Sequence, residues 1–102
     1  MPSINVDLDY FDHPKLQALM SMLGPSAETI PLKLWIATAR FHCNDGIWPN
    51  GATADIERRC GWRGQPGKCL EALAQARILE ITEAGIEAHD WLEYQGREIG
   101  LC

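Results

Sequence analysis

The chain has 102 residues and a mass of 11.4 kDa, with 46% hydrophobic and 23% charged residues. This length and composition predict a single globular domain over residues 1–102 and argue against two domains. The net charge of −5 argues against a uniformly basic surface, which nucleic-acid-binding domains usually carry. Lys33 and Arg40 interrupt the most apolar region, so no membrane association is expected.

The cysteines and the N-terminus favour a cytoplasmic protein with free thiols. Four cysteines do not make this chain cysteine-dense, and Asp7 and Asp9 stand where a signal peptide would need apolar residues. A reducing compartment is therefore expected.

The sequence offers no motif for catalysis, metal binding or cofactor binding. Histidines and cysteines show no CxxC or HxxxH spacing, and adjacent His42 and Cys43 suit tetrahedral zinc poorly. Gly61, Gly64 and Gly67 follow a three-residue rhythm instead of the GxGxxG of phosphate-binding loops. We therefore expect no enzyme, no metal and no cofactor.

The first elements are an arm and a helix. Residues 1–12 predict an N-terminal strand or extended arm, because apolar and polar residues alternate from Ile4 to Asp9. Asp12 is expected to cap an amphipathic helix over residues 13–23, which a Gly-Pro pair ends.

A second helix is predicted to begin near Ser26 or at Pro31 and to end before an Asn-Asp-Gly turn. Its expected buried residues are Leu32, Trp35, Ile36, Ala39 and Cys43. A short extended piece over residues 47–49 follows.

Two closely spaced helices come next. Thr53 is expected to cap a helix over residues 53–60, and Gly61 to terminate it. After a Gly-rich corner, Pro66 opens a helix over residues 66–76.

The C-terminal part predicts a hairpin. Apolar and polar residues alternate over residues 79–82 and 86–88, on either side of a tight turn at 83–85. A helical turn over residues 91–95 and a tail over 97–102 complete the chain.

This order predicts a mainly α fold with a small β-hairpin wing, the winged helix-turn-helix. In that fold the helix over residues 53–60 is the supporting helix, the helix over 66–76 is the recognition helix that contacts DNA, and the hairpin is the wing. The short strand at residues 47–48 would pair with the wing as a third strand.

Three stretches resemble a known family. Residues 6–15 (VDLDYFDHPK), residues 32–35 (LKLW) followed by Gly46, and residues 89–95 (HDWLEYQ) look like the N-terminal winged-helix domain of phage-type replication proteins. These replisome organisers are related to the primosomal DnaD-like proteins, and the resemblance covers about residues 4–96. It implies DNA binding or self-association during the initiation of replication.

Charge is distributed unevenly along the sequence. Residues 57–77 carry five basic and two acidic side chains, net +3, whereas the other 81 residues carry four basic and twelve acidic ones, net −8. Because basic side chains that neutralise phosphates release counterions, the basic segment predicts weak, salt-sensitive binding of duplex DNA. The predicted contacts are Arg58, Arg59, Arg63, Gln65, Lys68, Gln75 and Arg77. An ordinary solvated helix face is the alternative.

Base recognition is expected to be weak. The outward positions of the predicted recognition helix are Gly67, Lys68, Glu71, Ala72 and Gln75. Lys68 can reach guanine and Gln75 adenine, but Glu71 repels phosphate. The turn of the hairpin has no basic residue to enter a minor groove.

A protein-interaction or self-assembly module of a replication complex is the second interpretation. The acidic surface is free for a protein partner, and the arm over residues 4–8 offers a strand edge for a homo-oligomer. Trp62, next to Arg63, is a candidate stacking platform for single-stranded DNA, whereas the other tryptophans are expected in the core or at corners.

Overall fold

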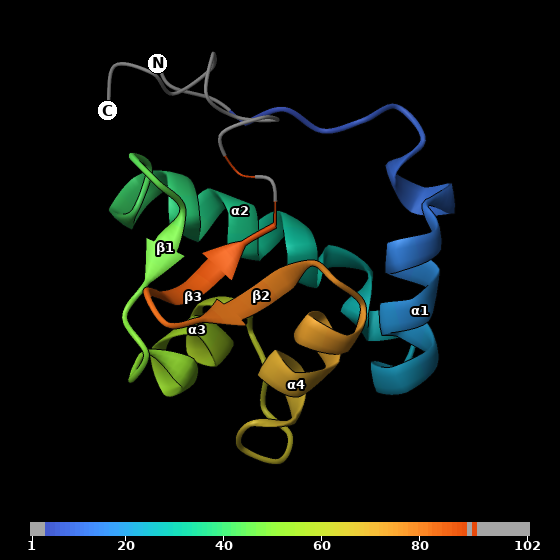
Figure 1. Ribbon diagram of the computed structural model, residues 1–102. Coiled ribbons are helices and arrows are strands. Elements are labelled where there is room, and N and C mark those ends of the chain that lie inside the picture. Colours follow the sequence, from blue (N-terminus) through green and yellow to red (C-terminus); the bar gives the residue numbers. More distant parts are fainter. Residues whose placement is uncertain (1–3, 90, 92–102) are drawn as a thin grey trace.

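The computed structural model describes residues 4–89 and 91. Its helices are α1 (Pro14–Leu23), α2 (Ile30–Phe41), α3 (Thr53–Arg59) and α4 (Lys68–Gln75), and its strands are β1 (Ile47–Trp48), β2 (Leu79–Thr82) and β3 (Gly85–Ala88). Short 3-10 helices cover Tyr10–Asp12 and Pro25–Thr29. The described part is therefore mainly helical with a small antiparallel sheet (Figure 1). None of its helices is long and apolar enough to cross a membrane.

The sheet contains the hairpin and the third strand that the sequence predicts. β3 lies in the centre, with β1 and β2 antiparallel on its two sides. Trp48 of β1 lies opposite Ile86 of β3. Gly85 permits this close pairing, because its φ is +144° and a Cβ there would stand 2.1 Å from the Trp48 carbonyl oxygen. The predicted hairpin and its pairing with residues 47–48 are both confirmed.

The core takes a central side chain from every helix and from the middle strand. Leu19, Leu34, Ile56, Leu73 and Ile86 are each at most 2% exposed and belong to one hydrophobic cluster. In Figure 1 the hairpin lies in front of α2 and α3, with α1 to one side. Burial of these apolar side chains is the main stabilising contribution, and it leaves the opposite side of each helix for other contacts.

The buried face of α2 differs from the predicted one. Leu34, Ala37 and Thr38 are buried, whereas Ile36 is 49% exposed. Thr38 can take a core position because its hydroxyl donates to the Leu34 carbonyl oxygen at 2.8 Å and accepts from Trp48 Nε1 at 3.0 Å. The predicted stripe is therefore wrong, since apolar periodicity does not register a threonine whose polar group is satisfied inside the core.

Three helix starts also differ from expectation, and one of them is that of α4, which begins at Lys68 and not at Pro66. His13, not Asp12, caps α1, because its Nδ1 accepts the Lys15 backbone N–H at 3.1 Å. Thr53 is the first residue of α3, and Ala52 occupies the cap position. Both predicted caps are wrong by one residue, which moves the capping group but not the helix.

The two ends of the described chain differ in how firmly they contact the core. Of the predicted strand or arm over residues 1–12, residues 4–7 form no helix or strand, residues 8–9 form a turn and Tyr10–Asp12 form a 3-10 helix, so the strand is wrong and an irregular segment takes its place. The predicted helical turn over 91–95 and the tail over 97–102 lie outside the described residues, except for Trp91. Trp91 is 2% exposed, and its Nε1 donates to the Cys43 carbonyl oxygen at 2.9 Å.

Candidate nucleic-acid interface

A buried carboxylate joins α3 to α4. Glu57 is 5% exposed; its Oε1 accepts the Gly67 N–H at 2.8 Å and its Oε2 accepts the Leu70 N–H at 3.0 Å. N–H groups at the start of a helix lack helical partners, and the helix dipole favours a negative charge there. Glu57 therefore ties the start of α4 to α3. From the sequence alone it counts as an exposed charge of residues 57–77, and its burial removes it from the surface.

Trp62 supports the turn between α3 and α4. Its indole Nε1 donates to the Gln65 carbonyl oxygen at 2.9 Å. Its ring lies so close to Gly64 that a Cβ there would stand 2.4 Å from it. The side chain also packs against the core and is only partly exposed. Trp62 thus shapes the turn, and a role in stacking on bases stays a prediction.

The exposed side of α4 and the turn before it bring three predicted contacts together. Gln65, Lys68 and Gln75 line one shallow groove of about 510 Å³, which Met22 and Leu23 from the end of α1 also line. We call this surface the α4 groove. All three polar residues are exposed, so they are available to a partner.

Two further residues of α4 modify the groove. Glu71 lines it and places a carboxylate among the basic and amide side chains. Ala72, which was expected to face outward, is 4% exposed because α1 packs against this side of α4. The outward prediction is therefore wrong for Ala72.

Arg58 and Arg59 do not line the α4 groove. Both contact the Asp55 carboxylate, Arg59 through Nε at 3.2 Å. The hydrogen bond from Arg58, aided by Arg59, holds the pKa of Asp55 below its usual range. The Arg59 guanidinium also lies 4.1 Å from the ring centre of Phe41 in α2. These two arginines therefore belong to a surface that α3 forms with α2.

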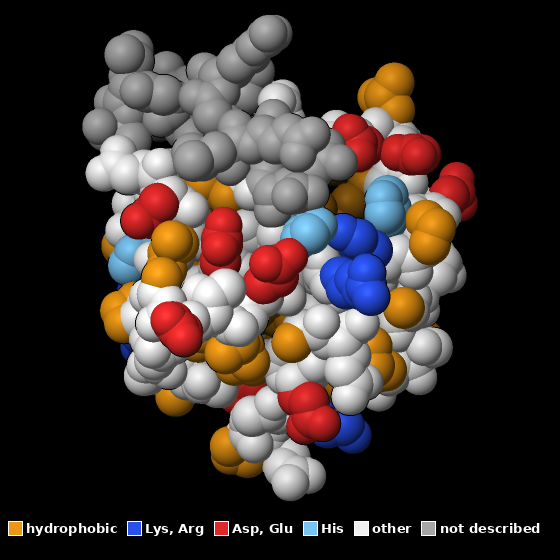
Figure 2. All heavy atoms as spheres, in the orientation of Figure 1, with side chains coloured by type: hydrophobic (Ala, Val, Ile, Leu, Met, Phe, Trp, Pro, Cys, Tyr) orange, Lys and Arg blue, Asp and Glu red, His pale blue; other side chains and the backbone are white. Residues whose placement is uncertain are grey.

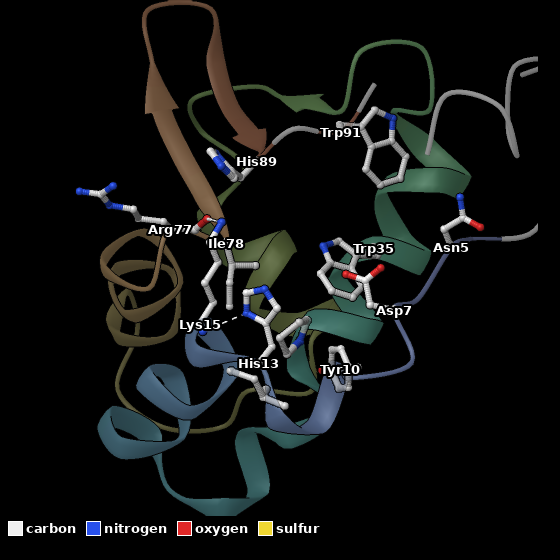
Figure 3. A pocket seen from close by; sticks show the side chains of 12 residues that line it. Asn5, Asp7, Tyr10, His13, Lys15, Trp35, Arg77, Ile78, His89 and Trp91 are labelled. Atoms are coloured by element: carbon white, nitrogen blue, oxygen red, sulfur yellow. Dashed lines mark hydrogen bonds between the residues drawn. The ribbon is translucent and has the colours of Figure 1, made fainter. Parts of the chain in front are cut away.

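Arg77 lies just beyond α4, at the rim of a cavity of about 120 Å³ (Figure 3). Its carbonyl oxygen accepts from Lys15 Nζ at 3.2 Å, and its side chain points away from the cavity. His13 and His89 line the same cavity. Figure 2 shows the resulting group of basic and histidine side chains beside the acidic ones of the hairpin. Sequence reasoning missed Lys15, because nothing in its neighbourhood signals an approach to a residue 62 positions away.

The other wall of this cavity is aromatic. Tyr10, Trp35 and Trp91 line it, and the rings of Tyr10 and Trp35 meet edge to face with 5.7 Å between their centres. The Tyr10 hydroxyl donates to the Glu28 carbonyl oxygen at 2.6 Å. Burial raises the pKa of Tyr10 to about 12. This contact fixes the end of the N-terminal segment to the body of the protein.

The seven predicted contacts are therefore not one surface. Gln65, Lys68 and Gln75 meet in the α4 groove, Arg63 is exposed in the turn before α4, and Arg77 follows the helix beside Lys15. No carboxylate among the described residues forms an ion pair with Arg63 or Lys68. Arg58 and Arg59 lie with α2 instead.

The cysteines are in different states. Cys60 and Cys69 are free and buried, and burial raises the pKa of each thiol to about 12. Cys43 is disulfide-bonded, so the expectation of free thiols is wrong for this residue. Within residues 4–89 and 91, the side chains of His, Cys, Asp and Glu form no group of three or more that could hold a metal ion.

Compared with known proteins, the chain matches no family model, no curated protein and no solved structure. Its function is therefore argued from the surfaces described above.

Proposed function

We propose that the chain is a winged helix-turn-helix module that binds duplex DNA weakly, within a phage-like replication initiation or regulatory protein. In this proposal α3 and α4 are the helix-turn-helix, α4 is the recognition helix and the hairpin of β2 and β3 is the wing. The order of the elements and the three-stranded sheet support the fold assignment. The resemblance of the sequence to phage-type replication proteins supports the role in replication.

One observation carries the proposal: Arg63, Lys68 and Arg77 around α4 are exposed and have no acidic partner among the described residues. Arg63 precedes α4, Lys68 is its first residue and Arg77 follows its end. Lys15, from α1, lies beside Arg77. Of these four, Lys68 lines the α4 groove together with the carboxylate of Glu71, whereas Arg77 and Lys15 line the neighbouring cavity. Cations before, on and after α4 suit contacts to phosphates, and the amide groups in the groove can hydrogen-bond to bases or sugar.

The same surface predicts weak and poorly specific binding. Glu71 repels phosphate, and Glu83 at the tip of the hairpin gives the wing an acidic end. We therefore expect binding that depends on salt more than on sequence. If three or four phosphates are neutralised, the logarithm of the affinity falls with the logarithm of salt concentration with a slope of about −3.

Fluorescence anisotropy with a labelled duplex, at low and at physiological salt, tests the proposal. The sharpest comparison uses two double variants with the same change in net charge, Arg63→Glu/Lys68→Glu at α4 and Lys33→Glu/Arg40→Glu on α2. Loss of two or more phosphate contacts should weaken binding by the first variant at least about tenfold, and binding by the second much less. Equal losses would show that only net charge matters, and no binding of the parent chain at low salt would refute the proposal.

A protein-interaction module is the second candidate, and a specific observation favours it. Val6, Leu8 and Phe11 are large hydrophobic side chains that are 43%, 107% and 55% exposed. Three exposed apolar side chains within six residues are typical of a segment that docks on a partner. A chain that binds no DNA but elutes as a larger species would favour this second function.

A further inference from the structure

The exposed hydrophobic side chains of the described part fall mainly on two surfaces of opposite charge. Of the six large ones, Val6, Leu8 and Phe11 lie on the N-terminal segment, residues 4–12, and Ile36 and Phe41 lie on α2. The N-terminal segment carries three carboxylates and no basic side chain. The apolar part of α2 is surrounded by basic side chains instead.

The basic surface is formed by α2 and α3 together. The ring of Phe41 is 46% exposed and lies between two guanidinium groups, that of Arg59 at 4.1 Å and that of Arg40 at 5.1 Å from its centre. Lys33 lies on the same helix, near the end of α3 at Gly61. We call this surface the α2–α3 face; its residues are Lys33, Ile36, Arg40, Phe41, Arg58 and Arg59. With Asp55 as its one paired carboxylate, the face has a net charge of +3.

The acidic surface is free to reach a partner. The side chains of Asp7, Asp9 and Asp12 have no hydrogen bond or ion pair with any described residue. Tyr10 is buried against the body of the protein, but Leu8 projects fully into solvent and Val6 and Phe11 are about half exposed, so these three side chains are available to a partner. The three carboxylates of the segment are complementary in charge to the α2–α3 face, whose net charge is +3. The three apolar side chains between them are complementary to the exposed isoleucine and phenylalanine of that face.

We propose that the N-terminal segment of one copy docks on the α2–α3 face of a second copy. The guanidinium groups beside Phe41 would pair with carboxylates of the segment, and Leu8 would cover Ile36 and Phe41. Because the segment and the face are different surfaces, two copies can exchange segments as a closed two-fold dimer, or copies can bind head-to-tail in a ring or a growing chain. This assembly does not use the α4 groove, so it is independent of the proposed DNA binding.

Sedimentation velocity of the full chain, from about 10 µM to about 1 mM, tests this assembly. We expect the average mass to rise with concentration at low salt and less so at high salt, because exposed charge pairs are screened. Leu8→Ser should weaken association by roughly tenfold and leave the fold unchanged, since this side chain is fully solvated in the single chain.

Two charge-reversed variants decide whether this pair of surfaces is responsible. Asp7→Lys/Asp9→Lys gives a basic segment and a basic face, and Lys33→Glu/Arg40→Glu gives an acidic segment and an acidic face. Each variant alone should be monomeric, whereas an equimolar mixture should associate, because each segment then meets a face of opposite charge. Glu83→Lys, at the tip of the hairpin, is the control and should associate like the parent chain.

Several outcomes would overturn the assembly. A parent chain that stays monomeric throughout would refute the assembly. Association that survives in either variant alone would place the contact elsewhere. Variants that are folded by circular dichroism but do not associate when mixed would also refute it. Anisotropy with duplex DNA at concentrations below association keeps the two proposals separate, since reversal at Arg63 and Lys68 should weaken DNA binding and preserve assembly.

Discussion

The unit of α3 and α4 and the N-terminal segment both contain carboxylates, but they use them in opposite ways. Glu57 is buried and accepts two backbone N–H groups at the start of α4. Asp7 and Asp9 are exposed, and no described residue binds their side chains. A carboxylate satisfied inside the fold fixes a helix and leaves the surface basic, whereas an unsatisfied one leaves negative charge for a partner. The net charge of −5 therefore conceals two kinds of acidic residue.

Removal of Glu57 should give the largest effect on stability. Glu57→Ala leaves two N–H groups at the start of α4 without their acceptor and loses two charge-assisted hydrogen bonds. We expect the free energy of unfolding to fall by about 2–4 kcal/mol. Urea unfolding followed by circular dichroism measures this. Asp9→Ala is the matched control from the N-terminal segment and should change stability by less than about 0.5 kcal/mol. Equal effects at the two positions would contradict the comparison.

Alkaline pH should also act on α3 and α4 more than on the N-terminal segment. The pKa values of the Cys60 and Cys69 thiols are raised to about 12 from 9.0, because burial disfavours the thiolate. The unfolded chain loses these protons first, so stability is complete below pH 9 and falls as pH rises toward 12. The expected slope is up to about 1.4 kcal/mol per pH unit for each thiol.

Urea unfolding at a series of pH values from neutral to above 10 checks this slope. Tyr10, whose pKa is raised to about 12 from 10.0, adds to the loss at the upper end. Cys60→Ala/Cys69→Ala should make the dependence shallower between pH 9 and 10. An unchanged slope in that variant would assign the alkaline loss to other groups.

The sequence predicts the local features of this fold better than its surfaces. Alternating residues and a glycine turn were enough to predict the hairpin, and helix punctuation was enough to predict four helices close to their observed bounds. Thr38 shows where periodicity fails, because a polar residue enters the core through hydrogen bonds to distant partners. The buried face of α2 was therefore wrong.

The candidate site was predictable only in part, for a similar reason. Lys68 and Gln75 line the same groove because residues seven positions apart lie on one face of a helix, which spacing alone indicates. Arg59 lies with Phe41 and Lys15 lies beside Arg77, and both arrangements depend on how helices pack. Charge summed along a sequence cannot distinguish these surfaces, whereas the packed structure separates them.

The smallest expected effects on stability come from the N-terminal segment, and they distinguish Tyr10, which packs on the folded body, from Leu8, which does not. Tyr10→Phe removes the hydrogen bond to the Glu28 carbonyl oxygen and keeps the ring against Trp35. This loss should cost about 1 kcal/mol. Leu8→Ser, two residues earlier, should cost less than about 0.5 kcal/mol in the single chain, because Leu8 makes no buried contact there. Thermal unfolding at low protein concentration measures both. A large loss from Leu8→Ser would mean that the segment is already docked on the body, and the acidic side chains around it would then serve the fold as Glu57 does.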